Sequence, residues 1–140
     1  MHAILLFYGR AYTGTGPQPS ADNFQRIVDA HLRYERDVLR TRASVVLGQA
    51  LSPAVTARTV SFTAPGTQHV EAGPAVATDE ALGGFYVIEC RDLDEAQELA
   101  SLYPMPPGFG RIEVRLILPF DPALRQEVLA GAGANQTRNQ

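Results

Sequence analysis

The order in which apolar strands and amphipathic helices alternate constrains the fold of this chain more than any other feature. Residues 3–8 are uniformly apolar, as in a strand covered on both faces, and residues 85–90 form a second strongly apolar strand. Apolar residues recur at spacings of three and four over 21–41 and again over 92–103, which predicts two amphipathic helices. Alternating polar and apolar residues over 111–118 predict a last strand. The chain is therefore expected to fold as a single α+β domain.

Three shorter strands are predicted between the first helix and the second long strand. Residues 44–48 form one, and 57–63 and 67–70 form the arms of a hairpin that turns at Pro65-Gly66. The resulting order is that of a ferredoxin-like α+β fold, with one antiparallel sheet and its helices on one face. The opposite face would carry apolar residues of the two long strands. We therefore expect a second copy of the chain to cover it, giving a homodimeric α/β barrel in which two sheets face each other.

The C-terminal part is expected to be an extension of a domain that spans residues 1–120. Asp121 precedes a proline and marks the start of a short helix, which Gly131 is expected to end. A C-terminal helical extension is therefore predicted over 121–131. Residues 132–140 have no apolar pattern, which predicts a mobile tail.

The cationic residues are all arginine, and this excludes two classes of enzyme. Lys+Arg is 12, and every one of these residues is an arginine. Without a lysine the chain cannot form a Schiff base with a carbonyl or a pyridoxal cofactor, and it cannot build an ordinary nucleotide-binding phosphate loop. The single cysteine, Cys90, excludes an intrachain disulfide and a Cys-rich zinc site. We expect Cys90 to be a small buried hydrophobic residue.

The net charge and the hydropathy of the chain indicate which partners the protein binds and in which compartment it is found. The net charge of −3 and the pI of about 5.5 give no electrostatic footprint for nucleic acid. The N-terminal segment lacks the basic flank and the length of a signal peptide, and no apolar run approaches the length of a membrane span. We therefore expect a cytoplasmic protein that binds neither nucleic acid nor membrane.

The sequence also predicts that the protein has no metal site and no cofactor. Its histidines, His2, His31 and His69, do not have the spacing of metal ligands. The glycines at 83 and 84 do not form the dinucleotide-binding motif that follows a strand. His69 lies in the predicted hairpin, where we expect it to be exposed.

Five short segments, in order from about residue 3 to residue 118, carry a resemblance to a known family. They are Leu5-Leu6-Phe7-Tyr8-Gly9, Gly48-Gln49-Ala50-Leu51, the stretch from Val70 to Tyr86, Asp92-Leu93-Asp94-Glu95-Ala96 and Ile112-Glu113-Val114-Arg115. Together they resemble the YCII-related family, and in particular its branch of DGPF-domain proteins. The resemblance implies a dimeric α+β barrel of the ferredoxin-like kind. It also implies kinship with small cofactor-free lyases and isomerases that act on unsaturated or aromatic rings.

The motif that gives the branch its name is degenerate in this chain. Where relatives have Asp-Gly-Pro followed by an aromatic residue, the sequence reads Ala72-Gly73-Pro74-Ala75, and Ala77 replaces the usual glutamate. If those groups are functional in relatives, this chain either does something else or uses the neighbouring Glu71. The Gly-Pro turn is retained, and the loss of the aromatic ring frees space for a ligand.

His31 is the leading candidate for acid–base chemistry. It lies one helical turn before Glu35 on the same face, close enough for the two side chains to pair. A carboxylate beside an imidazole would orient it and raise its pKa, which suits proton transfer near neutral pH. The resemblance adds that the family carries its suspected catalytic histidine at this position. The alternative is a half-buried histidine satisfied by a backbone group, with Glu35 at the rim.

Four residues in strands are candidates for substrate binding. Arg115 is the first choice to hold a substrate carboxylate, whereas a network between Glu113 and Arg115 would be structural. Tyr8 and Tyr86 end or lie in the long apolar strands and are expected to form walls of the site, with proton donation as a lesser role.

The stiff apolar loop over 103–110 is a further candidate for ligand contact. It contains three prolines, and Met105 and Phe109 are its expected contacts with an apolar ligand. A contact with a second subunit explains the same loop equally well.

These observations support two hypotheses about function. The first is a small cofactor-free enzyme of the lyase, isomerase or cyclase kind, acting on an apolar conjugated or aromatic carbonyl compound. In it His31 moves the proton, Glu35 orients it, and Arg115 or a tyrosine stabilises the enolate. The second is a non-catalytic small-molecule-binding or accessory protein with the same barrel, which the loss of the motif acid at Ala72 favours.

Overall fold

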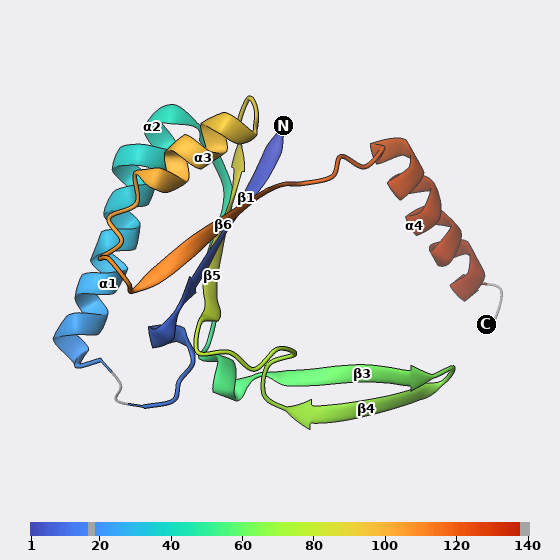
Figure 1. The fold of residues 1–140 in the computed structure, drawn as a ribbon. Helices are drawn as coiled ribbons and strands as arrows, with labels where there is room; N and C mark the ends of the chain where they lie inside the picture. Colours follow the sequence, from blue (N-terminus) through green and yellow to red (C-terminus); the bar gives the residue numbers. More distant parts are fainter. Residues whose placement is uncertain (17–18, 138–140) are drawn as a thin grey trace.

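A four-stranded antiparallel sheet forms the centre of the fold in the computed structural model, which describes residues 1–16 and 19–137 (Figure 1). Its strand order is β2-β5-β1-β6. The strands span Ser44–Ala50 (β2), Ala81–Glu89 (β5), His2–Gly9 (β1) and Gly110–Leu116 (β6). This order is that of a ferredoxin-like sheet, and it confirms the fold predicted from the sequence.

Helices cover one face of this sheet (Figure 1). They are α1 (Ala21–Tyr34), which a π turn (Glu35–Leu39) joins to the short α2 (Arg40–Arg42), and α3 (Leu93–Ser101). Side-chain caps fix both long helices at their N-termini, since Ser20 accepts a hydrogen bond from the Asn23 backbone N–H and Asp92 accepts one from that of Glu95.

The helix predicted over 21–41 is helical throughout, but its regular geometry is interrupted. In the π turn the Arg40 N–H donates to the Glu35 carbonyl, five residues back. Tyr34 and Leu39, also five apart, are consequently both buried. Phe24 and Leu32, two of the apolar residues whose spacing predicts this helix, lie before the π turn and are 59% and 58% exposed.

The core lies between the helices and the covered face of the sheet. Alternation along β1 turns Leu5 and Phe7 toward the helices, where they pack with Leu39, Ile88 and Leu99. These five side chains are fully buried. Cys90 is buried at the edge of this core, as predicted, and burial raises the pKa of its thiol.

On the opposite face of the sheet, here called the open face, no helix of the described residues 1–16 and 19–137 packs against the strands (Figure 1). Its centre carries the half-buried apolar side chains of Ile4, Leu6, Phe85 and Val87. The edge strand β6 adds Arg111, Glu113 and Arg115, which are exposed. The open face therefore combines an apolar centre with a charged margin.

Two elements project from the domain (Figure 1). The hairpin of β3 (Arg58–Ala64) and β4 (Thr67–Ala72) forms a separate two-stranded sheet, as its turn sequence predicts, and β4 is exposed along its whole length. Short 3₁₀ turns at Arg10–Tyr12 and Ala54–Thr56 follow β1 and β2, and they lie close together, since the Val55 N–H donates to the Thr13 carbonyl at 2.9 Å. The other projecting element is the C-terminal helix.

The C-terminal helix α4 (Pro122–Thr137) is longer than predicted. It begins as expected, with the Asp121 carboxylate accepting a hydrogen bond from the Ala123 N–H at 2.9 Å. It does not end at Gly131, and the backbone over 132–137 is helical where a mobile tail was predicted; residues 138–140 lie outside the described part of the chain. The glycines here alternate with alanines, whose high helix propensity offsets the cost of glycine.

Candidate functional site

His31 lies on the inner side of α1, half-buried against the sheet. Its Nε2 atom is 3.0 Å from the Tyr103 hydroxyl, and its ring packs edge-on to Phe7 with centroids 5.3 Å apart. Tyr103 follows α3, so the hydrogen bond joins residues 72 positions apart. The folded sheet and both helices are therefore needed to bring these two groups together.

The His31–Tyr103 pair belongs to an aromatic cluster formed by Phe7, His31, Tyr34, Tyr86 and Tyr103. Phe7 is at its centre, with ring centroids 5.0 Å from Tyr103 and 5.8 Å from Tyr86. Tyr34 closes the cluster and donates a 2.7 Å hydrogen bond to the Leu99 carbonyl in the last turn of α3. Edge-to-face contacts of this kind fix the rings more firmly than burial alone would.

A glycine opposite Tyr86 makes room for its ring. Gly48 in β2 is the register partner of Tyr86 in β5, and a Cβ at this position would lie 2.6 Å from the ring. The absence of a side chain lets Tyr86 lie across the strand with its hydroxyl 3.4 Å from the His31 carbonyl. Gly48 is therefore a determinant of the cluster that propensity reasoning does not identify.

Burial sets the protonation state of the cluster. It lowers the pKa of His31, because the charged imidazolium is less well solvated there than in water. Burial also raises the pKa of Tyr103, with smaller contributions from Tyr12 and Tyr86. At neutral pH the pair is thus a neutral imidazole and a protonated phenol, the combination in which the histidine can accept a proton.

Glu35 is placed differently from the sequence-based prediction. Its Oε1 accepts hydrogen bonds from Arg40 Nε at 3.0 Å and Nη2 at 2.6 Å. Burial raises the pKa of the Tyr86 hydroxyl to about 12, and the negative charge of Glu35 acts in the same direction. Within residues 1–16 and 19–137, no hydrogen bond or ion pair joins Glu35 to His31. The histidine is paired with Tyr103 instead.

The other strand candidates lie apart from His31. The register pairs Leu6 with Glu113 and Ile4 with Arg115, which puts both charged residues on the open face. Tyr8 lies on the same face, opposite Arg111. Of the strand residues predicted to bind substrate, the structure therefore brings only Tyr86 to the histidine.

A hollow of about 380 Å³ lies between α3 and β6 beside Tyr103, and we call it the α3–β6 hollow. Met105 lines it, as a predicted ligand contact, whereas Phe109 is largely exposed. Arg111 also lines it, with its Nε 2.9 Å from the Glu80 carboxylate. The remaining lining residues are Gln97, Ala100, Ser101, Tyr103, Gly110, Ile112 and Val114. This volume lies in the range of small-ligand sites.

Sequence reasoning did not identify Tyr103 as a site residue. Tyr103 was predicted only as part of the buried stripe of its helix, and nothing in its local sequence indicates a histidine partner 72 residues away.

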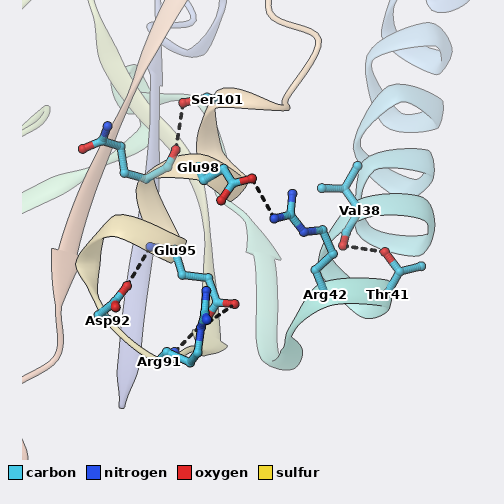
Figure 2. Close-up of polar contacts among 9 residues, drawn as sticks. Val38, Thr41, Arg42, Arg91, Asp92, Glu95, Glu98 and Ser101 are labelled. Carbon is cyan, nitrogen blue, oxygen red and sulfur yellow. Dashed lines mark hydrogen bonds and ion pairs between the residues drawn. The ribbon is translucent and has the colours of Figure 1, made fainter.

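A second hollow, of about 530 Å³, lies at the other end of the helix layer, and we call it the charged hollow. Figure 2 shows its polar contacts, in which Arg42 reaches Glu98 at 2.7 Å and Arg91 pairs with Glu95. Cys90 contributes to its lining. Both arginines are thus paired with carboxylates, which leaves this hollow without a net cationic character.

The degenerate motif serves the hairpin rather than the histidine. Gly73 has φ +104°, and its N–H donates to the Ala57 carbonyl at 2.7 Å while its own carbonyl accepts from the Thr59 hydroxyl. Glu71, the acid nearest the motif, faces His69 at 3.2 Å. The motif therefore closes the base of the hairpin, where a non-glycine residue would be strained.

Neither metal nor membrane features stand out in the described ranges. No group of three or more His, Cys, Asp or Glu side chains within residues 1–16 and 19–137 is arranged to hold a metal ion. Over the same ranges, no helix has both the length and the apolar character needed to cross a bilayer.

Comparison with known proteins gives two matches. The sequence model of a family described as YCII-related domain matches residues 5–121. A protein of Rhizobium meliloti (strain 1021), whose name states only that it is uncharacterized, is 40% identical over 98 residues. That alignment covers 64% of this chain and 77% of the relative.

Proposed function

Because the chain belongs to the YCII-related domain family, we propose that it is a small enzyme that carries out acid–base chemistry without a cofactor. The reaction is of the lyase, isomerase or cyclase kind, and the substrate is an apolar conjugated or aromatic carbonyl compound. The observation that carries this proposal is the 3.0 Å contact between His31 Nε2 and the Tyr103 hydroxyl in a buried aromatic cluster.

The proton moves between substrate carbon, Tyr103 and His31. Tyr103 borders the α3–β6 hollow and reaches His31, so its oxygen takes a proton from the substrate as its own proton passes to Nε2. The carbon–hydrogen bond breaks and its electron pair becomes an enolate. Return of the proton to a different carbon of the conjugated system completes an isomerisation with no other reactant.

A phenol is the better candidate to stabilise the enolate. Tyr103 lines the α3–β6 hollow, whereas Tyr86 does not and Arg115 lies on the open face of the sheet. A protonated phenol can donate a hydrogen bond to the developing charge in a site with little water.

Deuterium exchange tests the proposal without knowledge of the natural reaction. The protein is incubated in D₂O with a panel of α,β-unsaturated ketones, lactones and quinols, and loss of the acidic C–H signals is followed by ¹H NMR. We expect at least one compound to exchange faster than in buffer, and His31→Ala to slow that exchange by about 10²–10⁴-fold. Arg42→Gln, in the charged hollow, is the matched control and should exchange at the parent rate.

Two outcomes would overturn the enzyme proposal. One is the absence of exchange across the panel, and the other is full exchange by His31→Ala. If a compound shifts the NMR signals of Tyr103 and Met105 without exchanging, the protein is a small-molecule-binding or accessory protein. Ala72, at the position where the resemblance to DGPF-domain proteins implies an acid, favours that second function.

We also propose that the protein is a homodimer of a domain spanning residues 1–120, with α4 as an extension. The apolar centre of the open face, formed by Ile4, Leu6, Phe85 and Val87, supports a second copy as its cover. Light scattering at micromolar concentration is expected to give twice the mass of the chain. A monomeric mass for the full chain would contradict the dimer.

A further inference from the structure

We propose that Arg40 is a positioning residue for the histidine site: across the π turn it holds the Glu35 carboxylate away from His31, so that the imidazole keeps Tyr103 as its partner. The role of His31 rests on the proposed function. The placement of Glu35 rests on contacts that are independent of any reaction.

Helix geometry gives Glu35 two possible partners. His31 precedes it by four residues across regular α-helix, the spacing at which side chains meet. Arg40 follows it by five residues, a spacing that turns side chains about 140° apart in a regular helix. The carboxylate can therefore reach Arg40 only because the helix between them is wider than usual.

The π turn supplies that width. The Arg40 N–H bonds to the Glu35 carbonyl, so residues five apart lie one above the other. Two guanidinium nitrogens then contact the same carboxylate oxygen, at 3.0 and 2.6 Å. Burial of both Tyr34 and Leu39 uses the same turn, so the turn serves the core as well as the ion pair.

The position of the Glu35 carboxylate matters for His31 because both groups lie in a partly buried environment. Its side chain is 21% exposed, so its charge is less screened by water than that of a surface carboxylate. The groups that face His31 from the sheet and from the end of α3 are the phenols of Tyr86 and Tyr103, which are uncharged at neutral pH. Tyr12, which acts on Tyr103, is a phenol as well.

Release of Glu35 would therefore change the histidine. A carboxylate that swings back by one turn would pair with the imidazolium and favour its charged form. The site would then hold the His31–Glu35 dyad that its sequence spacing suggests, in place of a neutral imidazole bonded to a phenol. Arg40 selects between the two arrangements.

Titration of His31 by ¹H–¹⁵N NMR tests this inference. We expect Arg40→Gln to raise the pKa of His31 by about one unit relative to the parent protein. Arg40→Lys should restore part of the parent value, and the double variant Arg40→Gln/Glu35→Gln should restore it fully, because no carboxylate is then left to swing. Arg36→Gln is the matched control, since Arg36 pairs with Asp37 in the same turn at the protein surface.

The outcomes separate this inference from the proposed function. An unchanged His31 pKa in Arg40→Gln would overturn the inference even if deuterium exchange is observed. A raised pKa that persists in the double variant would also overturn it, because Glu35 would not be the cause. A raised pKa that the double variant reverses supports it, even where no compound exchanges. Arg40 is 59% exposed, so Arg40→Gln is expected to fold.

Discussion

The two ends of the helix layer handle polar groups in opposite ways. In the charged hollow, Asp92 and Arg91 bond within four residues of themselves, to Glu95, and the longer-range pair of Arg42 with Glu98 lies exposed at the surface (Figure 2). In the aromatic cluster, Tyr34 and Tyr103 bond to partners 65 and 72 residues away. Local pairing stabilises a helix end. Long-range pairing in an apolar environment forms only when the whole domain folds, and it leaves titratable groups buried. The cluster, and not the hollow with more charges, is therefore the place to seek chemistry.

The largest effect should come from removing the ring at the centre of the cluster. Phe7→Ala is expected to reduce the free energy of unfolding by about 3–5 kcal/mol, because the ring is buried against His31, Tyr86 and Tyr103. Urea denaturation measures it. Phe109→Ala, at a largely exposed position, should change the value by less than about 0.5 kcal/mol. A loss below about 1 kcal/mol for Phe7→Ala would show that the cluster is not part of the core.

A smaller loss is expected when the tie between α1 and α3 is cut. Tyr34→Phe keeps the ring but removes the hydroxyl that donates to the Leu99 carbonyl, at an expected cost of roughly 1–3 kcal/mol. The measurement is again urea denaturation, and Tyr8→Phe on the open face is the control. Equal stability of Tyr34→Phe and the parent would mean that water replaces the hydroxyl without loss.

At the charged end, the cap of α3 should matter more than any ion pair. Asp92→Ala is expected to cost about 1 kcal/mol, because the Glu95 N–H loses its acceptor. Asp92→Asn, which keeps a side-chain oxygen, should retain most of the stability in thermal denaturation. If both variants lose the same amount, the charge of Asp92 and not the cap would be responsible.

The pH dependence of stability should distinguish the aromatic cluster from the charged hollow, because burial lowers the pKa of His31 in the folded state. Unfolded chains then bind more protons than folded ones below the usual histidine pKa of about 6.5. The free energy of unfolding should decrease as the pH falls below that value and level off below the folded pKa. His31→Gln should lack this part of the profile in urea titrations between pH 5 and 8. Identical pH profiles of the parent protein and His31→Gln would contradict the lowered pKa of His31.

The smallest effect is expected from the ion pair at the surface of the charged hollow. Arg42→Gln should cost less than about 1 kcal/mol, because both Arg42 and Glu98 are solvent-exposed. A double-mutant cycle with Glu98→Gln gives the interaction energy, which added salt should reduce further. An interaction energy well above about 1 kcal/mol would show that the Arg42–Glu98 pair contributes substantially to the stability of the fold.

Periodicity predicted most of the fold because the spacing of apolar residues along a short segment differs between strands and helices. Apolar runs gave the central strands, and Pro65-Gly66 gave the hairpin turn. The same reasoning did not predict the π turn (Glu35–Leu39), which brings Glu35 and Arg40 together across five residues and lets Tyr34 and Leu39 both be buried. An inserted residue shifts every later position, and no local composition marks it.

The site was predictable in its central residue but not in its partner. His31 stood out as a titratable group on an apolar stripe. Tyr103 could not be paired with it in advance, because the contact depends on how α3 packs beside α1. Arg115 was assigned to the site from residue type, and only the strand register shows which face it occupies.

The position of β1 in the middle of the sheet has a consequence for how the protein is made. Its neighbours are β5 and β6, and the last of these ends at Leu116. At a synthesis rate of roughly 5–20 residues per second, the ribosome needs on the order of 10 s to reach β6 after it has made β1. Until β5 has been made, in the later part of that interval, the apolar segment has neither of its neighbouring strands to pair with. The first strand is therefore an unpaired apolar segment during much of synthesis, and segments of this kind are prone to aggregate.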